Sequence, residues 1–131
     1  MLGDHLVFPI LLSLDLAESR AFYHDTLGLE ILREDPERLI FRCGPSRLAV
    51  TISTVGTKDT QTQLAWLVPD IHAALDDVRA RGVPIQQYTA PDPVTDADGV
   101  ADMGYAWAAW IIDPHGNCLA LLETKAPPAT S

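Results

Sequence analysis

The sequence contains only two cysteines, and nothing in their spacing points to a cross-link or a metal. Cys43 and Cys118 form no CxxC pair and no cysteine–histidine cluster of the kind that binds zinc. Two cysteines in a chain of 131 residues are too few for a disulfide scaffold. A chain of this length buries roughly two-thirds of its unfolded surface, so it can fold around an apolar core alone. We therefore expect a protein of a reducing compartment, the cytoplasm.

Positive charge and long apolar runs are also scarce. Nine Lys and Arg stand against eighteen Asp and Glu, which gives a formal charge of −9 and argues against nucleic acid and anionic membrane surfaces as partners. The first apolar run, residues 6–12, is interrupted by Pro9 and is too short to cross a bilayer. Residues 1–4 lack the basic stretch of a signal peptide. We expect no nucleic-acid partner and no membrane anchor.

The first half of the chain predicts a βαβββ unit. Residues 6–14 are almost continuously apolar, which is typical of a strand covered on both faces. Asp15 is suited to cap a helix over residues 16–27, and Gly28 is suited to end it. Turn residues then separate three predicted strands, which span residues 29–33, 38–43 and 47–54.

The second half repeats this order. After a predicted strand over residues 63–68, Asp70 and Gly82 mark the ends of a second helix whose apolar residues share one face. Further predicted strands are residues 83–88, 105–112 and 118–123, with a polar loop at 89–104. We expect a single domain, 1–131, made of modules 5–55 and 61–123 with a flexible tail at 124–131.

The repeat and two motifs resemble a known superfamily. The first helix ends with Phe22-Tyr23 and Leu27-Gly28-Leu29, and the last hairpin turns through Asp113-Pro114-His115-Gly116-Asn117. Together they resemble the vicinal oxygen chelate superfamily, which includes glyoxalase I, extradiol dioxygenases, fosfomycin-modifying enzymes and bleomycin-resistance proteins. The resemblance spans residues 6–123. It implies an α+β fold in which tandem βαβββ modules form a cupped, open mixed β-sheet barrel with helices on the convex side. It also implies a homodimer whose cavities are completed by both chains.

The resemblance implies positions for a metal, and most of these positions lack ligands. Enzymes of the superfamily hold a divalent ion with His, Glu or Gln from the first and last strands of each module. Here the first position is Phe8, residues 47–55 contain no His, Asp or Glu, and the last position is Ala120. Gln63 alone is a donor, and one amide cannot hold a divalent ion in competition with water. We therefore expect no cofactor and no catalytic residue.

We expect the cup to bind an antibiotic or natural product without transforming it, as the bleomycin-resistance proteins in this superfamily do. Aromatic faces give planar ligands a large contact area, and the acidic balance fits a cationic ligand. In those proteins an aromatic residue stacks on the drug, and Tyr105 or Trp107 matches it. The predicted ligand is planar and hydrophobic, and its predicted contacts are Phe8, Leu12, Phe41, Ile52, Trp66, Tyr105 and Trp107, with Asp98 and Asp102 at the rim.

Three other functions stay open at this point. A metal-dependent lyase, isomerase or dioxygenase of the glyoxalase type would need an atypical site for one divalent ion, built on Gln63 and His5. A metal-free enzyme would use an Asp or Tyr of the cavity to move protons. A module for dimerisation or regulation would bind no ligand. All four histidines, His5, His24, His72 and His115, are expected at the surface or in turns.

Overall fold

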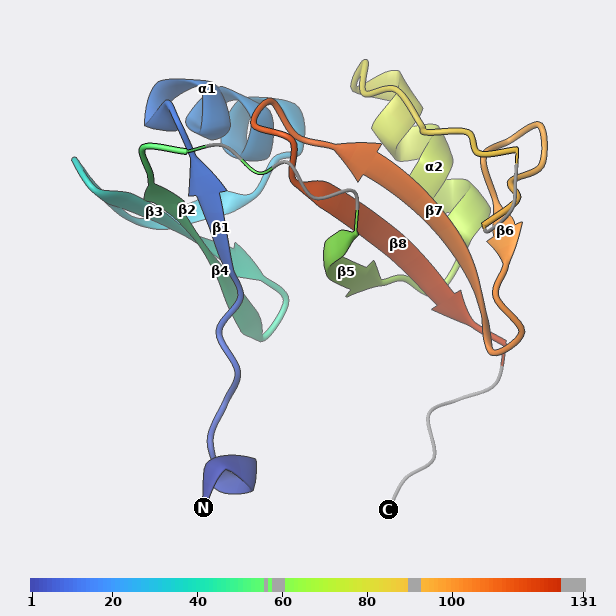
Figure 1. The fold of residues 1–131 in the computed structure, drawn as a ribbon, viewed down its shortest axis with the longest axis horizontal. Coiled ribbons are helices and arrows are strands. Elements are labelled where there is room, and N and C mark those ends of the chain that lie inside the picture. Colours follow the sequence, from blue (N-terminus) through green and yellow to red (C-terminus); the bar gives the residue numbers. More distant parts are fainter. Residues whose placement is uncertain (56, 58–60, 90–92, 126–131) are drawn as a thin grey trace. The chain divides into compact units, whose positions relative to one another are not determined.

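A computed structural model describes residues 1–55, 57, 61–89 and 93–125, and Figure 1 shows the chain as a ribbon. Its strands form two separate four-stranded sheets. The chain divides into two compact units, residues 1–59 with 114–117 and residues 60–113 with 118–131. The predicted α+β class with tandem modules is confirmed, and neither sheet closes on itself. No helix among the described residues is long and apolar enough to cross a membrane.

The first sheet has the order β1-β4-β3-β2, with β1 parallel to β4 and the other pairs antiparallel. Leu39, Leu48 and Val50 form the buried centre of this unit. Its elements, in chain order, are η1 (Leu2–Asp4), β1 (Ile10–Ser13), α1 (Leu16–Arg20), η2 (Ala21–Thr26), β2 (Glu30–Asp35), β3 (Arg38–Cys43) and β4 (Ser46–Ile52).

The first predicted helix has its expected ends, but it changes from an α-helix to a π-helix in the middle. The carboxylate of Asp15 accepts hydrogen bonds from the amides of Ala17 (2.9 Å) and Glu18 (3.3 Å), so it caps α1. The α-helix continues without a break into η2, which is a π-helix, and Gly28 follows at φ +81°. The Tyr23 ring of η2 is fully buried, with its centroid 5.6 Å from that of Phe41.

The predicted strand over residues 6–14 is wrong in its length and in its burial on both faces. Strand β1 begins only at Ile10, while Leu6 and Val7 are 98% and 89% exposed. Pro9 has no amide hydrogen to donate to a ladder, although its carbonyl accepts from the Ala49 amide at 3.0 Å. Because β1 is an outer strand with one open face, its burial alternates.

The second sheet has the order β5-β8-β7-β6, and β5 is parallel to β8. Asp70 caps the helix of this unit by accepting from the amides of His72 and Ala73, and Gly82 follows the helix at φ +82°. The elements are β5 (Thr62–Leu67), α2 (Ile71–Ala80), β6 (Ala101–Asp102), β7 (Ala106–Ile112) and β8 (Cys118–Thr124).

The predicted strand over residues 83–88 is wrong, because the short β6 occupies the outer position of this sheet. Pro84 has no amide hydrogen, and the Tyr88 amide donates to the hydroxyl of Thr95 at 2.8 Å. One ladder-like bond remains, from the Gln86 amide to the Trp110 carbonyl (2.9 Å). In the predicted loop, residues 90–92 lie outside the described residues, and the Asp96 carboxylate organises a turn by accepting from the Val100 amide.

Residues 114–117 of the turn between β7 and β8 belong to the first unit, in which polar contacts hold them. The Asn117 amide donates to the Leu12 carbonyl at 2.9 Å, and its oxygen accepts from the Thr57 hydroxyl at 2.8 Å. The ring of His115 accepts from the Leu14 amide. This part of the Asp113–Asn117 motif therefore has a structural role. In the predicted tail, Thr124 belongs to β8 and the Lys125 amide donates to the Tyr105 carbonyl, while residues 126–131 lie outside the described residues.

Candidate functional site

The two faces of the first sheet differ in what covers them. Phe41 pairs with Leu48, and Leu39 with Val50, and all four are buried on the face that carries α1 and η2. The opposite face carries the residues between them, such as Ile40 paired with Ala49. No described helix of this unit covers that second face, which we call the open face.

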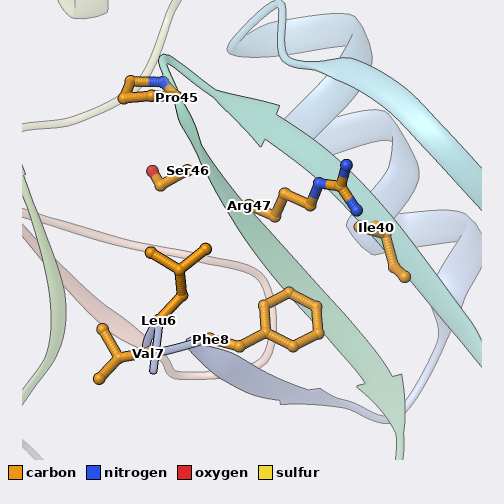
Figure 2. A pocket seen from close by; sticks show the side chains of 7 residues that line it. All are labelled: Leu6, Val7, Phe8, Ile40, Pro45, Ser46 and Arg47. Atoms are coloured by element: carbon orange, nitrogen blue, oxygen red, sulfur yellow. The ribbon is translucent and has the colours of Figure 1, made fainter. Parts of the chain in front are cut away.

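A cavity of about 630 Å³ lies at the end of this open face that adjoins the N-terminal segment. Such a volume is within the range of small-molecule sites. Figure 2 shows three of its residues on the segment that precedes β1 and the others on β3, β4 and the turn that joins them. Of the seven described residues that line it, five have apolar side chains; the seven are Leu6, Val7, Phe8, Ile40, Pro45, Ser46 and Arg47.

The two polar side chains of the cavity are poor candidates for moving protons. The hydroxyl of Ser46 donates to the Cys43 carbonyl at 2.6 Å, so its proton is engaged in the β3–β4 turn. The guanidinium of Arg47 has only N–H donors and no acceptor atom that could take a proton. The lining therefore offers apolar contact and one fixed positive charge.

Positive charge predominates on the open face although the whole chain is acidic. By register, four arginines point to this face, together with the two acidic residues Glu30 and Asp35. Glu30 pairs with Arg42 at 2.8 Å, and Asp35 pairs with Arg33 at 3.2 Å. The four arginines are Arg33, Arg38, Arg42 and Arg47.

Four of the predicted contact residues belong to the first unit, and they divide between the two faces. Phe8 lines the cavity, and Leu12 points to the open face because it pairs with Thr51. Phe41 is completely buried against Tyr23 on the helix-covered face. Ile52 pairs with Ser13, whose hydroxyl bonds to Ser19 of α1, so Ile52 shares that face. The structure thus brings Phe8 and Leu12 to the open face and leaves Phe41 and Ile52 behind the sheet.

In the second sheet, the face opposite α2 carries an aromatic pair that was not predicted from the sequence. The Tyr88 ring meets the Trp110 ring edge-on at 5.6 Å, and Trp110 donates to the Thr62 hydroxyl at 3.1 Å. Trp110 pairs with Ala120. The position of Trp110 could have been predicted from the sequence. A turn over residues 113–117 pairs residue 110 with Ala120, which was expected to face the cup.

Trp66 and Trp107 lie on the other face of this sheet. By register Trp107 lies beside Glu123, whose carboxylate accepts from the first amide of α2, and Trp66 pairs with Leu121 on the same face. Trp66 is half-buried, whereas Tyr105 precedes β7 and is largely exposed.

The predicted acidic rim already has positively charged partners within the chain. The ammonium of Lys125 lies 2.5 Å from the Asp102 carboxylate and 4.1 Å from the centre of the Trp107 ring. The carbonyl of Asp98 accepts a hydrogen bond from Arg79, while its side chain is exposed. Lys125 of the chain therefore already occupies the Asp102 carboxylate and the Trp107 ring face that a cationic ligand would use.

The residues considered for a metal do not form a donor cluster. Gln63 is exposed and its amide donates to the Gln61 carbonyl, and His5 is exposed on the N-terminal segment. Within the described ranges, no three His, Cys, Asp or Glu side chains are grouped so that they could hold an ion. Of the other histidines, His115 is buried in its turn, while His24 bonds to the Leu29 carbonyl and His72 is exposed.

Tyr88 and Cys118 are titratable groups of the second unit whose pKa values are raised. Burial raises the pKa of the Tyr88 phenol, and the neighbouring Cys118 raises it further. Burial also raises the pKa of the Cys118 thiol, against a hydrogen bond from Tyr88 that lowers it. Both groups are consequently protonated at neutral pH, so neither is a ready proton acceptor.

Comparisons with known proteins agree with this architecture. The family model described as Glyoxalase/Bleomycin resistance protein/Dioxygenase superfamily matches residues 4–121. No curated protein matches the sequence significantly. A solved glyoxalase/bleomycin resistance protein/dioxygenase from Alicyclobacillus acidocaldarius gives a TM-score of 0.71 at 17% identity, over 94% of this chain and 93% of that one.

Two further solved structures differ in what they do. A bleomycin-binding protein complexed with bleomycin gives a TM-score of 0.68 at 19% identity, with 92% of this chain and 99% of that chain covered. A lactoylglutathione lyase from Agrobacterium tumefaciens gives 0.62 at 20% identity, with 91% and 92% covered. At these identities the likeness shows the shared fold and no more.

Proposed function

Since the chain belongs to the Glyoxalase/Bleomycin resistance protein/Dioxygenase superfamily, we propose that it binds a planar, hydrophobic small molecule and releases it unchanged. The superfamily contains both binding proteins and enzymes, so the chemistry of this chain's own cavity decides between them. We place the ligand in the cavity at the open face of the first sheet, where Phe8 and Ile40 provide its main apolar contacts.

The observation that carries this proposal is the composition of the cavity lining. Five apolar side chains and an arginine can hold a molecule, and the lining residues that the structure describes include no His, Cys, Asp or Glu to transfer its protons or ligate a metal. Proteins that act by sequestration need only affinity and abundance, because they lower the free concentration of a toxin by mass action. An antibiotic or a toxic natural product is the class of molecule that fits such a role.

We propose further that two copies of the chain associate. Leu6 and Val7 are almost fully exposed, and Ile10 and Leu12 are 59% and 37% exposed on the open face. Exposed apolar side chains of this kind favour a partner, and a second copy of the same chain would cover them by an isologous contact.

The binding of a neutral fluorescent probe, N-phenylnaphthylamine, tests the proposal. Its rings match an apolar cavity, so we expect saturable binding that is unaffected by a chelator. Phe8→Ser removes the largest apolar side chain of the lining, and we expect it to weaken binding about tenfold or more. Tyr105→Ser, which removes an exposed aromatic residue of the second unit, serves as the control and should leave binding unchanged. Equal affinities of wild type and Phe8→Ser would contradict the proposal.

The alternative is a metal-dependent lyase, isomerase or dioxygenase, for which the lactoylglutathione lyase fold is the support. Such an enzyme would bind one divalent ion through Gln63 and His5. It would need further ligands, because among the described residues no three His, Cys, Asp or Glu side chains are grouped to hold an ion. Metal analysis of protein purified without chelator separates the two functions. A stoichiometric divalent ion that is lost in Gln63→Leu would favour the enzyme.

A further inference from the structure

We infer that the ligand of the first-sheet cavity carries an acidic group, such as a carboxylate, sulfonate or phosphate, and that Arg47 binds this group. The inference rests on the proposed function, because it specifies the chemistry of the molecule held at that site. The charge inferred for the ligand is opposite in sign to the one that the overall acidity of the chain favours.

In the part of the chain that the structure describes, Arg47 differs from the neighbouring arginines in having no acidic partner. Arg33, Arg38 and Arg42 pair with Asp35, Glu37 and Glu30 respectively. Among the described residues, no Asp or Glu forms an ion pair with Arg47, although the chain has twice as many acidic as basic residues. A cation left unpaired beside a cavity is a natural place for an anion from outside.

The sheet register also places Arg47 beside a second positive charge. Arg47 lies directly opposite Arg42 on the same face, and like charges in facing positions repel each other. Glu30 neutralises Arg42 from the far side, at 2.8 Å, so the charge of Arg47 is left over. An anionic ligand bound to the guanidinium of Arg47 would reduce the repulsion between Arg47 and Arg42, because its negative charge would balance the positive charge of Arg47.

The arrangement of the lining suits a ligand that has an acidic group next to an apolar body. Figure 2 shows the Arg47 side chain extending from β4 toward Ile40 of β3, with the Phe8 ring facing the same region. A ligand can thus lay its rings against Phe8 and Ile40 and direct its acidic end to the guanidinium, which presents a planar pair of donors to an oxyanion. The ligand class is therefore an amphiphilic aromatic or alicyclic acid.

A pair of probes with the same ring system tests this inference. Anilinonaphthalene sulfonate is anionic, and N-phenylnaphthylamine has the same rings without the charge. We expect wild type to bind the sulfonate about tenfold more tightly than the neutral probe, as one added charge-assisted contact would give, and to lose this preference at high salt. Arg47→Gln should abolish the preference, because it weakens the binding of the sulfonate much more than that of the neutral probe, and Arg47→Lys should restore most of the preference.

Arg33→Gln is the matched control, because it removes a charge from the same face at a residue that does not line the cavity. It should retain the preference for the sulfonate. If both probes bind equally well to wild type and Phe8→Ser weakens both, the inference about Arg47 is wrong while the proposed function stands. If neither probe responds to Phe8→Ser, the site itself is wrong and both ideas fall. A preference that survives in Arg47→Gln would also overturn the inference.

Discussion

Asp102, Lys125 and Trp107 form a small cluster in which the protein neutralises its own charge. The Lys125 ammonium reaches the Asp102 carboxylate at 2.5 Å and covers the Trp107 ring. The hydrogen bond from Lys125 is the main cause of the lowered pKa of Asp102, and the Gly104 amide adds to it. A carboxyl with a lowered native pKa contributes to stability above its ordinary pKa of 3.8, and this contribution is lost as the pH falls through the native value.

We predict that Lys125→Gln raises the pKa of Asp102 toward its ordinary value, because the charged donor is removed while the Gly104 amide remains. Titration of the side-chain carboxyl signals by NMR measures the change. Asp35 is the internal control, since its lowered pKa is due mainly to the Glu37 amide and should not move. An unchanged pKa of Asp102 in the variant would show that Lys125 does not contact it in solution.

At the scale of elements, the ends of helices and hairpins could be read from the sequence because short-range chemistry fixes them. Asp15 and Asp70 cap their helices, and Gly28 and Gly82 follow them with positive φ, as predicted. The turn over residues 113–117 also joins two paired strands. These features depend on neighbours only a few residues away.

Elements that depend on distant partners were harder to predict. Residues 6–9 have the composition of a buried strand, yet they lie outside the sheet since Pro9 interrupts the ladder. The strand expected at residues 83–88 is replaced by side-chain bonding between Tyr88 and Thr95. Phe8, which lines the cavity, could be named from the superfamily motif, but the position of Arg47 opposite Arg42 follows from the register of β4 against β3, which no local pattern reports.

The turn between β7 and β8 provides a test at this scale. Gly116 has φ +85°, and a side chain there would also collide with the Thr57 carbonyl oxygen. Gly116→Ala should therefore lower the free energy of unfolding by about 2–3 kcal/mol. Gly44→Ala is the matched control, because Gly44 has φ +56° but open space around it, and it should cost only about 1 kcal/mol. Urea denaturation compares the two, and equal losses would mean that the collision is relieved without cost.

On the scale of the whole molecule, the charge and the apolar surface of the protein are unevenly distributed. The chain carries a formal charge of −9, yet the open face of its first sheet has four arginines and two acids. The N-terminal segment adds exposed apolar side chains beside the same face. Net charge alone is therefore a poor guide to the surroundings of the cavity, because a sum over the chain does not say where the charges lie.

We predict that the protein is a dimer by light scattering and that Leu6→Asp shifts it toward the monomer, because the substitution places a charge in the proposed apolar contact. Val94→Asp is the control, since Val94 is similarly apolar and 56% exposed but belongs to the second unit. A monomeric wild-type protein, or a dimer indifferent to Leu6→Asp, would exclude the N-terminal segment from association.

The most direct test of the central claim is mass spectrometry of whatever the protein carries when it is purified, without chelator, from its native host. The same measurement on Phe8→Ser separates a ligand of the cavity from a contaminant. We expect wild type to release one intact organic compound with an apolar body and an acidic group, in amounts that fall sharply in the variant. A stoichiometric divalent ion, or a substrate together with its conversion product, would instead identify an enzyme and contradict a protein that only binds.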